Sequence, residues 1–197
     1  YYNLSPKGTA LITIGLALGG LKPFVCANLS DSLDMLSSIK LSSTSKENVT
    51  YIFVNDTIYT DKYNKISSPI FELGILRSIP DITLFRPADV NELVGSWDYV
   101  MNKKGTNILV LTSDFKGRLA STSKELTTKG AYIVKKEMGR LSGILVSSGS
   151  ELETTLRLSE ELESLGIFTR VVSMPSFNLC SLLTKEAKEE LFPVGAK

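Results

Sequence analysis

Short apolar runs alternate with helical patterns over the first 113 residues, and this alternation constrains the fold more than any other feature. The strand-like runs are residues 22–27, 49–54, 82–85 and 107–112. The helical patterns that alternate with them cover residues 8–19, 28–41, 69–78 and 88–102. Strands that are apolar throughout are typical of a parallel sheet covered on both faces. We therefore predict an α/β domain over residues 1–113, with a parallel sheet and helices on both faces.

The rest of the chain predicts a linker and a partial second α/β domain. Residues 114–130 are polar and lack apolar periodicity, which is typical of a linker. Residues 131–197 contain one β-α-β unit, with a capping box expected at Ser150 and Glu153 and a helix end at Gly166. Two parallel strands and one crossover helix bury too little surface to be stable alone. We expect either a partner that completes this domain or a longer chain.

Composition excludes several classes of function. The 22 basic and 21 acidic residues nearly cancel, so nucleic acid is not an expected partner. The apolar stretch at residues 10–27 contains three glycines, a lysine and a proline, so it is not a membrane span. Cys26 and Cys180 lack metal-ligand spacing and are expected to be free, buried thiols. These features predict an intracellular protein, either cytoplasmic or organellar.

The loop "NDTIYTDKYNKISSPIFEL", residues 55–73, follows a strand at the position where α/β proteins usually bind ligands. It carries aspartates, lysines and tyrosines, and the whole chain has no histidine. Histidine is the commonest general acid or base near neutral pH. Any acid-base chemistry in this chain must therefore use other groups.

Two long stretches resemble the transketolase family. "RSIPDITLFRPADVNE" and "GSELETTLRLSEELESLGIFTRVVSMPSF" match its pyrimidine-binding domain and the start of its C-terminal domain. The family-like groups are Arg86 to Asp89 with Asn91 and Glu92, Gly149 to Glu151, and Val171 to Pro175. A purely structural role for "RPADVNE" is the simpler interpretation, because its proline and early acidic residues suit the start of a helix.

The resemblance implies positions that bind thiamine diphosphate, and this chain departs from the family at each of them. The family's glutamate, which hydrogen-bonds the aminopyrimidine ring, corresponds to Pro6, which has no carboxylate. The three aromatic residues that wall in the ring correspond to Asn28, Asp31 and Asp34. Asp31 and Asp34 share a helix face, but an isolated acidic pair is usually solvated, so no metal site is expected.

The substrate-binding positions implied by the resemblance have also changed. Asn55 and Ser67 stand where the family has histidines, and Tyr63 replaces an aspartate; Asp56 is retained. Ser113 stands at the arginine that grips the sugar phosphate. These replacements predict that no residue of this chain is catalytic or binds the family's cofactor or substrate.

The hypothesis that follows is a catalytically inactive transketolase-like protein, an interaction or assembly module in a larger complex. It predicts no cofactor, neither thiamine diphosphate nor its magnesium or calcium ion. The alternative is a subunit of a split thiamine-diphosphate-dependent transketolase. A third, weaker hypothesis is a new small-molecule pocket lined by Asn28, Asp31, Asp34, Asn55 and Asp56. A protein partner, or a homodimer, is expected to cover the apolar helix at residues 8–19 and the strand at residues 22–27.

Overall fold

The computed structural model describes residues 5–56, 71–112, 117–193 and 195. The chain folds as two compact units. Unit 1 contains residues 1–84 and 100–113, and unit 2 contains residues 85–99 and 114–197. The domain bounds and the linker expected from the sequence stay predictions, and each unit is described by itself.

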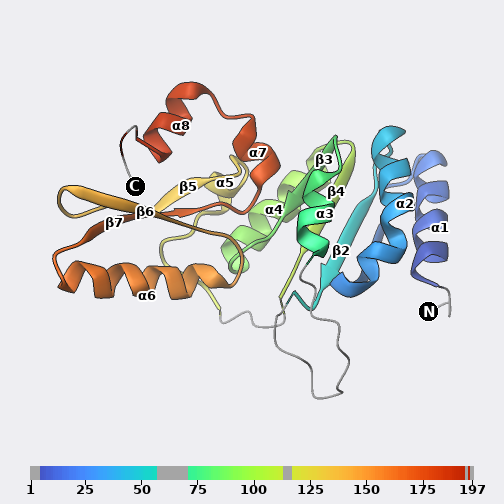
Figure 1. Ribbon diagram of the computed structural model, residues 1–197. Helices are drawn as coiled ribbons and strands as arrows, with labels where there is room; N and C mark the ends of the chain where they lie inside the picture. Colours follow the sequence, from blue (N-terminus) through green and yellow to red (C-terminus); the bar gives the residue numbers. More distant parts are fainter. Residues whose placement is uncertain (1–4, 57–70, 113–116, 194, 196–197) are drawn as a thin grey trace, which may run out of the picture. The chain divides into compact units, whose positions relative to one another are not determined.

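Unit 1 is built around a four-stranded sheet with the strand order β1-β2-β4-β3 (Figure 1). Strand β1 pairs in parallel with β2, and β2 pairs in parallel with β4, as the apolar runs predict. Its strands are β1 (Phe24–Asn28), β2 (Thr50–Val54), β3 (Ile82–Phe85) and β4 (Thr106–Val110). Its helices are α1 (Pro6–Leu18), the 3₁₀ turn η1 (Leu29–Asp31), α2 (Ser32–Thr44) and α3 (Glu72–Ser78). The expected parallel sheet flanked by helices is confirmed.

The core of unit 1 joins the sheet to one face of each helix. Helix α1 contributes Ala10, Ile14 and Ala17, at the spacing of three and four residues that places side chains on one face. Helix α2 contributes Met35 and Ile39 by the same rule. The strands supply fully buried side chains from both apolar and aromatic residues: Tyr51, Phe53, Leu84, Ile108 and Val110.

Helix α1 is apolar on its outer face as well. Ile12 is 52% exposed and Leu18 is 69% exposed, while Leu11 and Leu16 are also exposed. Strand β1 adds Phe24, which is 63% exposed, and the turn before it adds Leu21. We call these six residues the α1 surface. A helix that is apolar on every side is normally buried, so this surface is suited to an interface.

Unit 2 is built around a three-stranded sheet with the order β5-β7-β6. Strand β7 pairs in parallel with β6 and antiparallel with β5, so this sheet is mixed. The strands are β5 (Tyr132–Lys135), β6 (Leu141–Ser147) and β7 (Phe168–Ser173). The helices are α4 (Val90–Asn102, of which residues 90–99 belong to this unit), α5 (Lys124–Thr127), α6 (Glu151–Ser164), α7 (Phe177–Ser181) and α8 (Lys185–Leu191).

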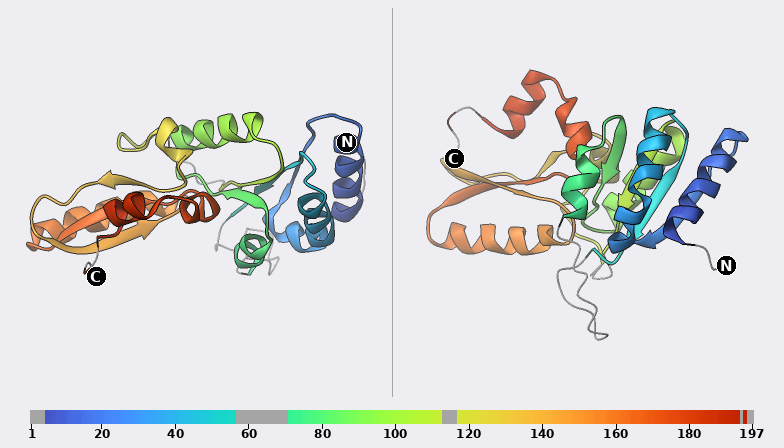
Figure 2. Two further views of the ribbon diagram at one scale, coloured as in Figure 1. Left: turned by 90° about the horizontal axis from the view of Figure 1, so that it is seen from above. Right: turned by 45° about the vertical axis from the view of Figure 1, so that its right-hand side comes forward.

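Helices cover both faces of this second sheet, with α6 on one face and α7 and α8 on the other (Figures 1 and 2). Successive residues of a strand point to opposite faces, and β7 follows that rule. Val171 packs in a cluster with Leu152 of α6, whereas Val172 packs with Cys180 and Leu191. Every helix in the described ranges is too short or too polar to serve as a membrane span.

One buried carboxylate organises unit 2. Oε1 of Glu92 accepts hydrogen bonds from Ser173 Oγ on β7 at 2.5 Å and from Tyr132 Oη on β5 at 2.8 Å. Oε2 accepts from the backbone amide of Ala88 at 2.7 Å. Burial raises the pKa of Glu92, although all three donors favour the charged form. The side chain has no exposed surface, so these bonds replace its contacts with water.

Several local expectations are corrected by the structure. Helix α4 begins at Val90 rather than at residue 88, because Asp89 Oδ1 accepts from the amide of Glu92 at 3.0 Å and caps the helix. Ser150 makes no capping bond through its side chain, so the predicted capping box at Ser150 and Glu153 is wrong. Both cysteines are free, but Cys26 is exposed rather than buried.

Polar residues 117–130 pack against the rest of unit 2. Leu119 donates its amide to Asp89 Oδ2 at 2.9 Å, and Thr122 Oγ1 donates to the same oxygen at 2.6 Å. The amide of Ser123 donates to Tyr132 Oη at 3.1 Å. These bonds fix the segment without the apolar periodicity that a sequence pattern can detect.

Replacing Glu92 by glutamine is expected to destabilise unit 2. The side-chain NH₂ of the glutamine would face a hydrogen-bond donor that now bonds to a carboxylate oxygen. Leaving that buried donor without an acceptor costs about 1–3 kcal/mol of the free energy of unfolding. The matched control, Glu160→Gln on the exposed side of α6, is expected to change stability by less than about 0.5 kcal/mol. Urea unfolding followed by fluorescence of Trp97, which lies in α4 within unit 2, measures both. Equal midpoints for the two variants would contradict this role of Glu92.

Gly130 and Gly166 provide a second matched pair. Both have positive φ, +86° and +76°, a conformation that costs other residues about 1–2 kcal/mol. A Cβ at Gly130 would lie 2.5 Å from the backbone nitrogen of Cys180, whereas a Cβ at Gly166 meets nothing within 4 Å. Gly130→Ala is therefore expected to lower the free energy of unfolding clearly more than Gly166→Ala. Thermal melts of the two variants measure the difference, and equal losses would show that the packing at Gly130 adjusts freely.

Candidate functional site

The candidate site lies at the carboxyl edge of the parallel sheet in unit 1. The register places Asn28, the last residue of β1, opposite Val54 of β2, and Phe53 opposite Val110 of β4. The three strands therefore end side by side. The start of α1, the start of α2 and the ends of β1 and β2 lie at the same edge of unit 1 (Figures 1 and 2). We call Asn28, Asp31, Asn55, Asp56 and Thr112 the carboxyl edge.

Three of these side chains form a chain of hydrogen bonds. Asn55 Nδ2 donates to Asn28 Oδ1 at 2.6 Å, which joins the ends of β2 and β1. Both the backbone amide and Nδ2 of Asn28 donate to Asp31 Oδ2, each at 3.3 Å. Asn55 adopts a positive φ of 63°, which asparagine tolerates better than most residues and which directs the chain out of the strand.

Asp56 and Thr112 form the buried part of the carboxyl edge. Asp56 is 7% exposed and Thr112 is 8% exposed. The amide of Asp56 donates to the carbonyl of Leu111 at 3.2 Å, so the chain after β2 stays beside the chain after β4. The sequence pattern predicts Thr112 only as the last residue of a strand at residues 107–112. Its position as a polar residue at the end of an apolar run was the feature that could have identified it.

The remaining predicted positions are less closely grouped. Pro6 is the first residue of α1, where its fixed φ suits a helix start, and Ser5 Oγ accepts from the amide of Gly8 at 3.2 Å. Asp34 is exposed in the first turn of α2. Tyr63, Ser67 and Ser113 lie outside the described residues. The structure therefore brings Asn28, Asp31, Asn55 and Asp56 to one edge of the sheet, and the roles of all these positions stay predictions.

The carboxyl edge offers amide donors, amide acceptors and carboxylates to a ligand. Asn28 and Asn55 are exposed and Asp31 is partly exposed, so their polar atoms are accessible. Among the described residues, no three aspartates, glutamates or cysteines are grouped as a metal ion would require. The arrangement can pair with a ligand that presents both donors and acceptors along one edge, as a nitrogen heterocycle does.

Two family models match the chain. Residues 2–114 match the transketolase pyrimidine-binding domain, and residues 130–197 match the transketolase-like C-terminal domain. The first match contains the whole carboxyl edge. The carboxyl edge therefore lies within the part of the chain that matches the pyrimidine-binding domain.

Known proteins support the same relationship. The chain is 34% identical to chloroplastic transketolase from Solanum tuberosum over 98% of its length, and 29% identical to transketolase from Aquifex aeolicus over 98%. A crystal structure of transketolase from Pichia stipitis with sedoheptulose 7-phosphate matches 97% of the chain at 26% identity, with a TM-score of 0.90. That match covers 29% of the Pichia chain. A structure described as a split-gene transketolase, inactive β4 tetramer, matches 95% of this chain and 60% of its own, at 20% identity and a TM-score of 0.76.

Two predictions made from the sequence are wrong in the light of these matches. The chain was predicted not to be an enzyme, but its relatives are named as transketolases, which are enzymes. It was also predicted to have no cofactor, but the model that matches residues 2–114 describes a pyrimidine-binding domain. Both predictions inferred inactivity from replaced side chains. The loss of a family residue does not show that the residue in its place, such as Asn28 or Asp31, has no role in binding a ligand.

The relationship covers nearly all of this chain but only part of each relative. The chain spans 27% of the length of the potato transketolase and 29% of the Aquifex one. The resemblance stated from the sequence is confirmed, because the pyrimidine-domain model alone matches more than half of the chain. This chain belongs to the transketolase family.

Proposed function

We propose that this chain is one subunit of a split, thiamine-diphosphate-dependent transketolase. It supplies the pyrimidine-binding domain and part of the C-terminal domain, and a partner chain supplies the part that holds the diphosphate. The observation that carries this proposal is the pair of family matches, to residues 2–114 and 130–197, taken with the split-gene transketolase whose structure shares this fold.

A solved transketolase with a split gene supports the proposal. This chain matches 60% of the length of that protein's chain but 29% of the Pichia chain, so the split-gene chain is the shorter of those two. Its description as a split-gene transketolase, inactive β4 tetramer, applies to that protein, and a tetramer of one kind of chain that is inactive agrees with a need for a second part. It provides a precedent in the same fold for dividing this enzyme between chains.

The carboxyl edge has groups that suit the aminopyrimidine ring of the cofactor. That ring presents an amino donor and nitrogen acceptors, and the edge presents the Asn28 amide beside the Asp31 carboxylate. Asn28 and Asp31 would hold the ring's polar edge, and the Asn55 side chain would keep Asn28 in place through their 2.6 Å bond. When bound, thiamine diphosphate supplies the group that stabilises the carbanion in ketol transfer.

Proton handling at this edge differs from the family pattern that the resemblance implies. Pro6 has no ionisable group, and no histidine exists in the chain. The carboxylates of Asp31 and Asp56 are the acid-base groups that the carboxyl edge provides. Asp31 is the accessible one, and its Oδ2 is already oriented by two bonds from Asn28.

The proposal predicts activity only in the presence of a complementing part. The partner is the portion of Aquifex aeolicus transketolase that lies outside the matched region, expressed separately. The mixture, with thiamine diphosphate and Mg²⁺, is expected to transfer a ketol group from xylulose 5-phosphate to ribose 5-phosphate, and each part alone is not. Asp31→Asn is expected to weaken cofactor binding at least tenfold, which is about 1.4 kcal/mol.

The matched control is Asp81→Asn, an exposed aspartate directly before β3, at the amino end of that strand. It is expected to leave cofactor affinity unchanged. Isothermal titration measures affinity, and a coupled assay measures turnover. A complex that forms but neither binds thiamine diphosphate nor turns over would contradict the proposal.

The α1 surface is proposed as the interface of this subunit with the assembled enzyme, either a partner chain or a second copy. Ile12→Lys places a charge at its centre and is expected to weaken association at least tenfold. Leu165→Lys, at an exposed leucine after α6 in unit 2, is the control and is expected to have no effect. Sedimentation velocity of the chain, alone and with the complementing part, measures both. A chain that stays monomeric in every mixture would show that the α1 surface is no interface.

A further inference from the structure

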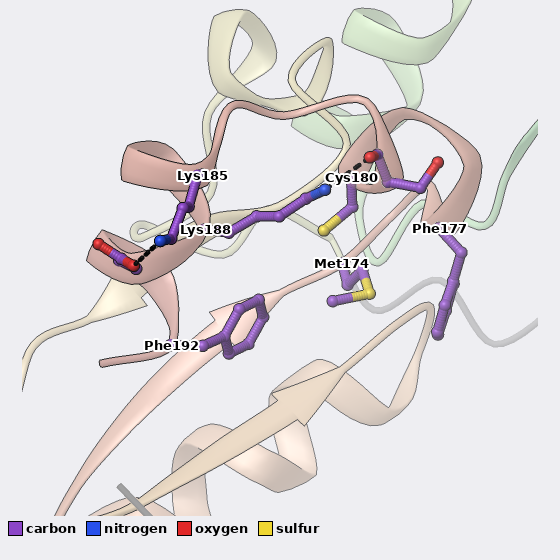
Figure 3. A pocket seen from close by; sticks show the side chains of 8 residues that line it. Met174, Phe177, Cys180, Lys185, Lys188 and Phe192 are labelled. Carbon is purple, nitrogen blue, oxygen red and sulfur yellow. Dashed lines mark hydrogen bonds and ion pairs between the residues drawn. The ribbon is translucent and has the colours of Figure 1, made fainter. Parts of the chain in front are cut away.

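A pocket of about 370 Å³ lies in unit 2 beneath α7 and α8 (Figure 3). Its lining includes Met174, Cys180, Lys185, Lys188, Glu189 and Phe192. Its volume is at the small end of the ~300–1,000 Å³ range of ligand pockets. None of these residues belongs to the carboxyl edge, so the pocket is formed by different residues from those of the proposed transketolase site.

The inner part of the pocket is apolar. Figure 3 shows Met174, Cys180 and Phe192 facing the same hollow from the end of β7, from α7 and from the end of α8. Met174 and Cys180 are each less than 10% exposed, so they form its floor. Burial raises the pKa of the Cys180 thiol, which therefore stays protonated near neutral pH and acts as an apolar lining group.

The mouth of the pocket carries positive charge. Lys188 reaches from α8 to the end of α7, where its Nζ donates to the carbonyl of Ser181 at 2.6 Å (Figure 3). An ammonium group has three donors, so this bond leaves two for a ligand. Among the residues that the structure describes, Lys188 forms no ion pair with a carboxylate, and the glutamate of the lining, Glu189, pairs with Lys185 at 3.7 Å.

The walls of the pocket are held in place by the fold. Arg170 of β7 is buried and donates from Nη1 to the carbonyl of Glu190 in α8 at 2.6 Å. Its Nε and Nη2 donate to the two carboxylate oxygens of Glu137, at 2.8 and 2.6 Å. This bidentate pair fixes the guanidinium that positions α8, so the hollow does not depend on a ligand to form.

From this arrangement we propose that the pocket binds a small carboxylic acid with an apolar body. The apolar part lies against Met174, Cys180 and Phe192, and the carboxylate accepts hydrogen bonds from Nζ of Lys188. Charge complementarity selects this class over a neutral apolar molecule, because the lining carries two lysines and one glutamate, and Lys188 forms no ion pair within the described residues. A charge-assisted bond to a carboxylate is also stronger than a bond to a neutral acceptor.

The test uses the full chain with octanoate as the probe. Octanamide has the same apolar body without the charge, and acetate has the charge without the body. Isothermal titration is expected to show octanoate binding at least tenfold more tightly than either. Binding is localised by the rate at which N-ethylmaleimide alkylates Cys180, measured in a Cys26→Ser background so that one thiol remains. Saturating octanoate is expected to slow that rate at least fivefold.

Lys188→Gln is expected to reduce octanoate affinity at least tenfold, whereas Lys104→Gln, at an exposed lysine of unit 1, is expected to leave it unchanged. Circular dichroism of both variants checks that they fold. Equal affinity for octanoate and octanamide would overturn the proposal, because the apolar surface alone would then drive binding. Failure of octanoate to bind, or binding that leaves Cys180 alkylation unchanged, would overturn it as well.

Discussion

The carboxylate of Glu92 is the interaction on which unit 2 depends. It accepts hydrogen bonds from β5 through Tyr132, from β7 through Ser173, and from the amide of Ala88. A buried charge is costly unless donors surround it, so these segments are constrained to meet at one point. Residues 85–99 accordingly belong to unit 2, whose sheet begins more than thirty residues later in the sequence, at Tyr132. The motif "RPADVNE" therefore does more than begin a helix, because its Glu92 also accepts hydrogen bonds from two strands of the sheet in unit 2.

Much of the fold follows from patterns that a single sequence contains. Each predicted strand of unit 1 is present, because apolar β-branched runs such as "VTYIF" have few alternatives in a soluble chain. Helix α6 and its end at Gly166 were likewise expected, since the leucine spacing and a glycine with positive φ are local features. The packing of residues 117–130 was not predicted, because it depends on hydrogen bonds from Leu119 and Thr122 to Asp89, which lies about thirty residues earlier in the sequence. Helices as short as α7 and α8 are marginal in isolation and depend on tertiary contacts, so a local sequence pattern does not predict them.

The candidate site was predictable in position but not in chemistry. Asn28, Asn55 and Asp56 each follow an apolar strand, and parallel strands end at one edge, so their proximity was expected. The bond between Asn55 and Asn28 depends on the positive φ of Asn55, which no sequence pattern specified. The inference of an inactive protein failed because it compared residues with a family pattern one at a time. Asn28 hydrogen-bonds both Asp31 and Asn55. The polar groups that a ligand would meet therefore depend on the three residues together and not on each one alone.

We propose that the carboxyl edge binds the pyrimidine ring of thiamine diphosphate in an assembled enzyme. Hydrogen–deuterium exchange of this chain with its complementing part, with and without thiamine diphosphate and Mg²⁺, tests it most directly. The cofactor is expected to slow exchange at the amides of Asn28 to Asp31 and of Asn55, and to leave exchange in strands β5 to β7 unchanged. Exchange at residues 28–31 and 55 that is identical with and without cofactor, in a complex shown to have formed, would contradict it.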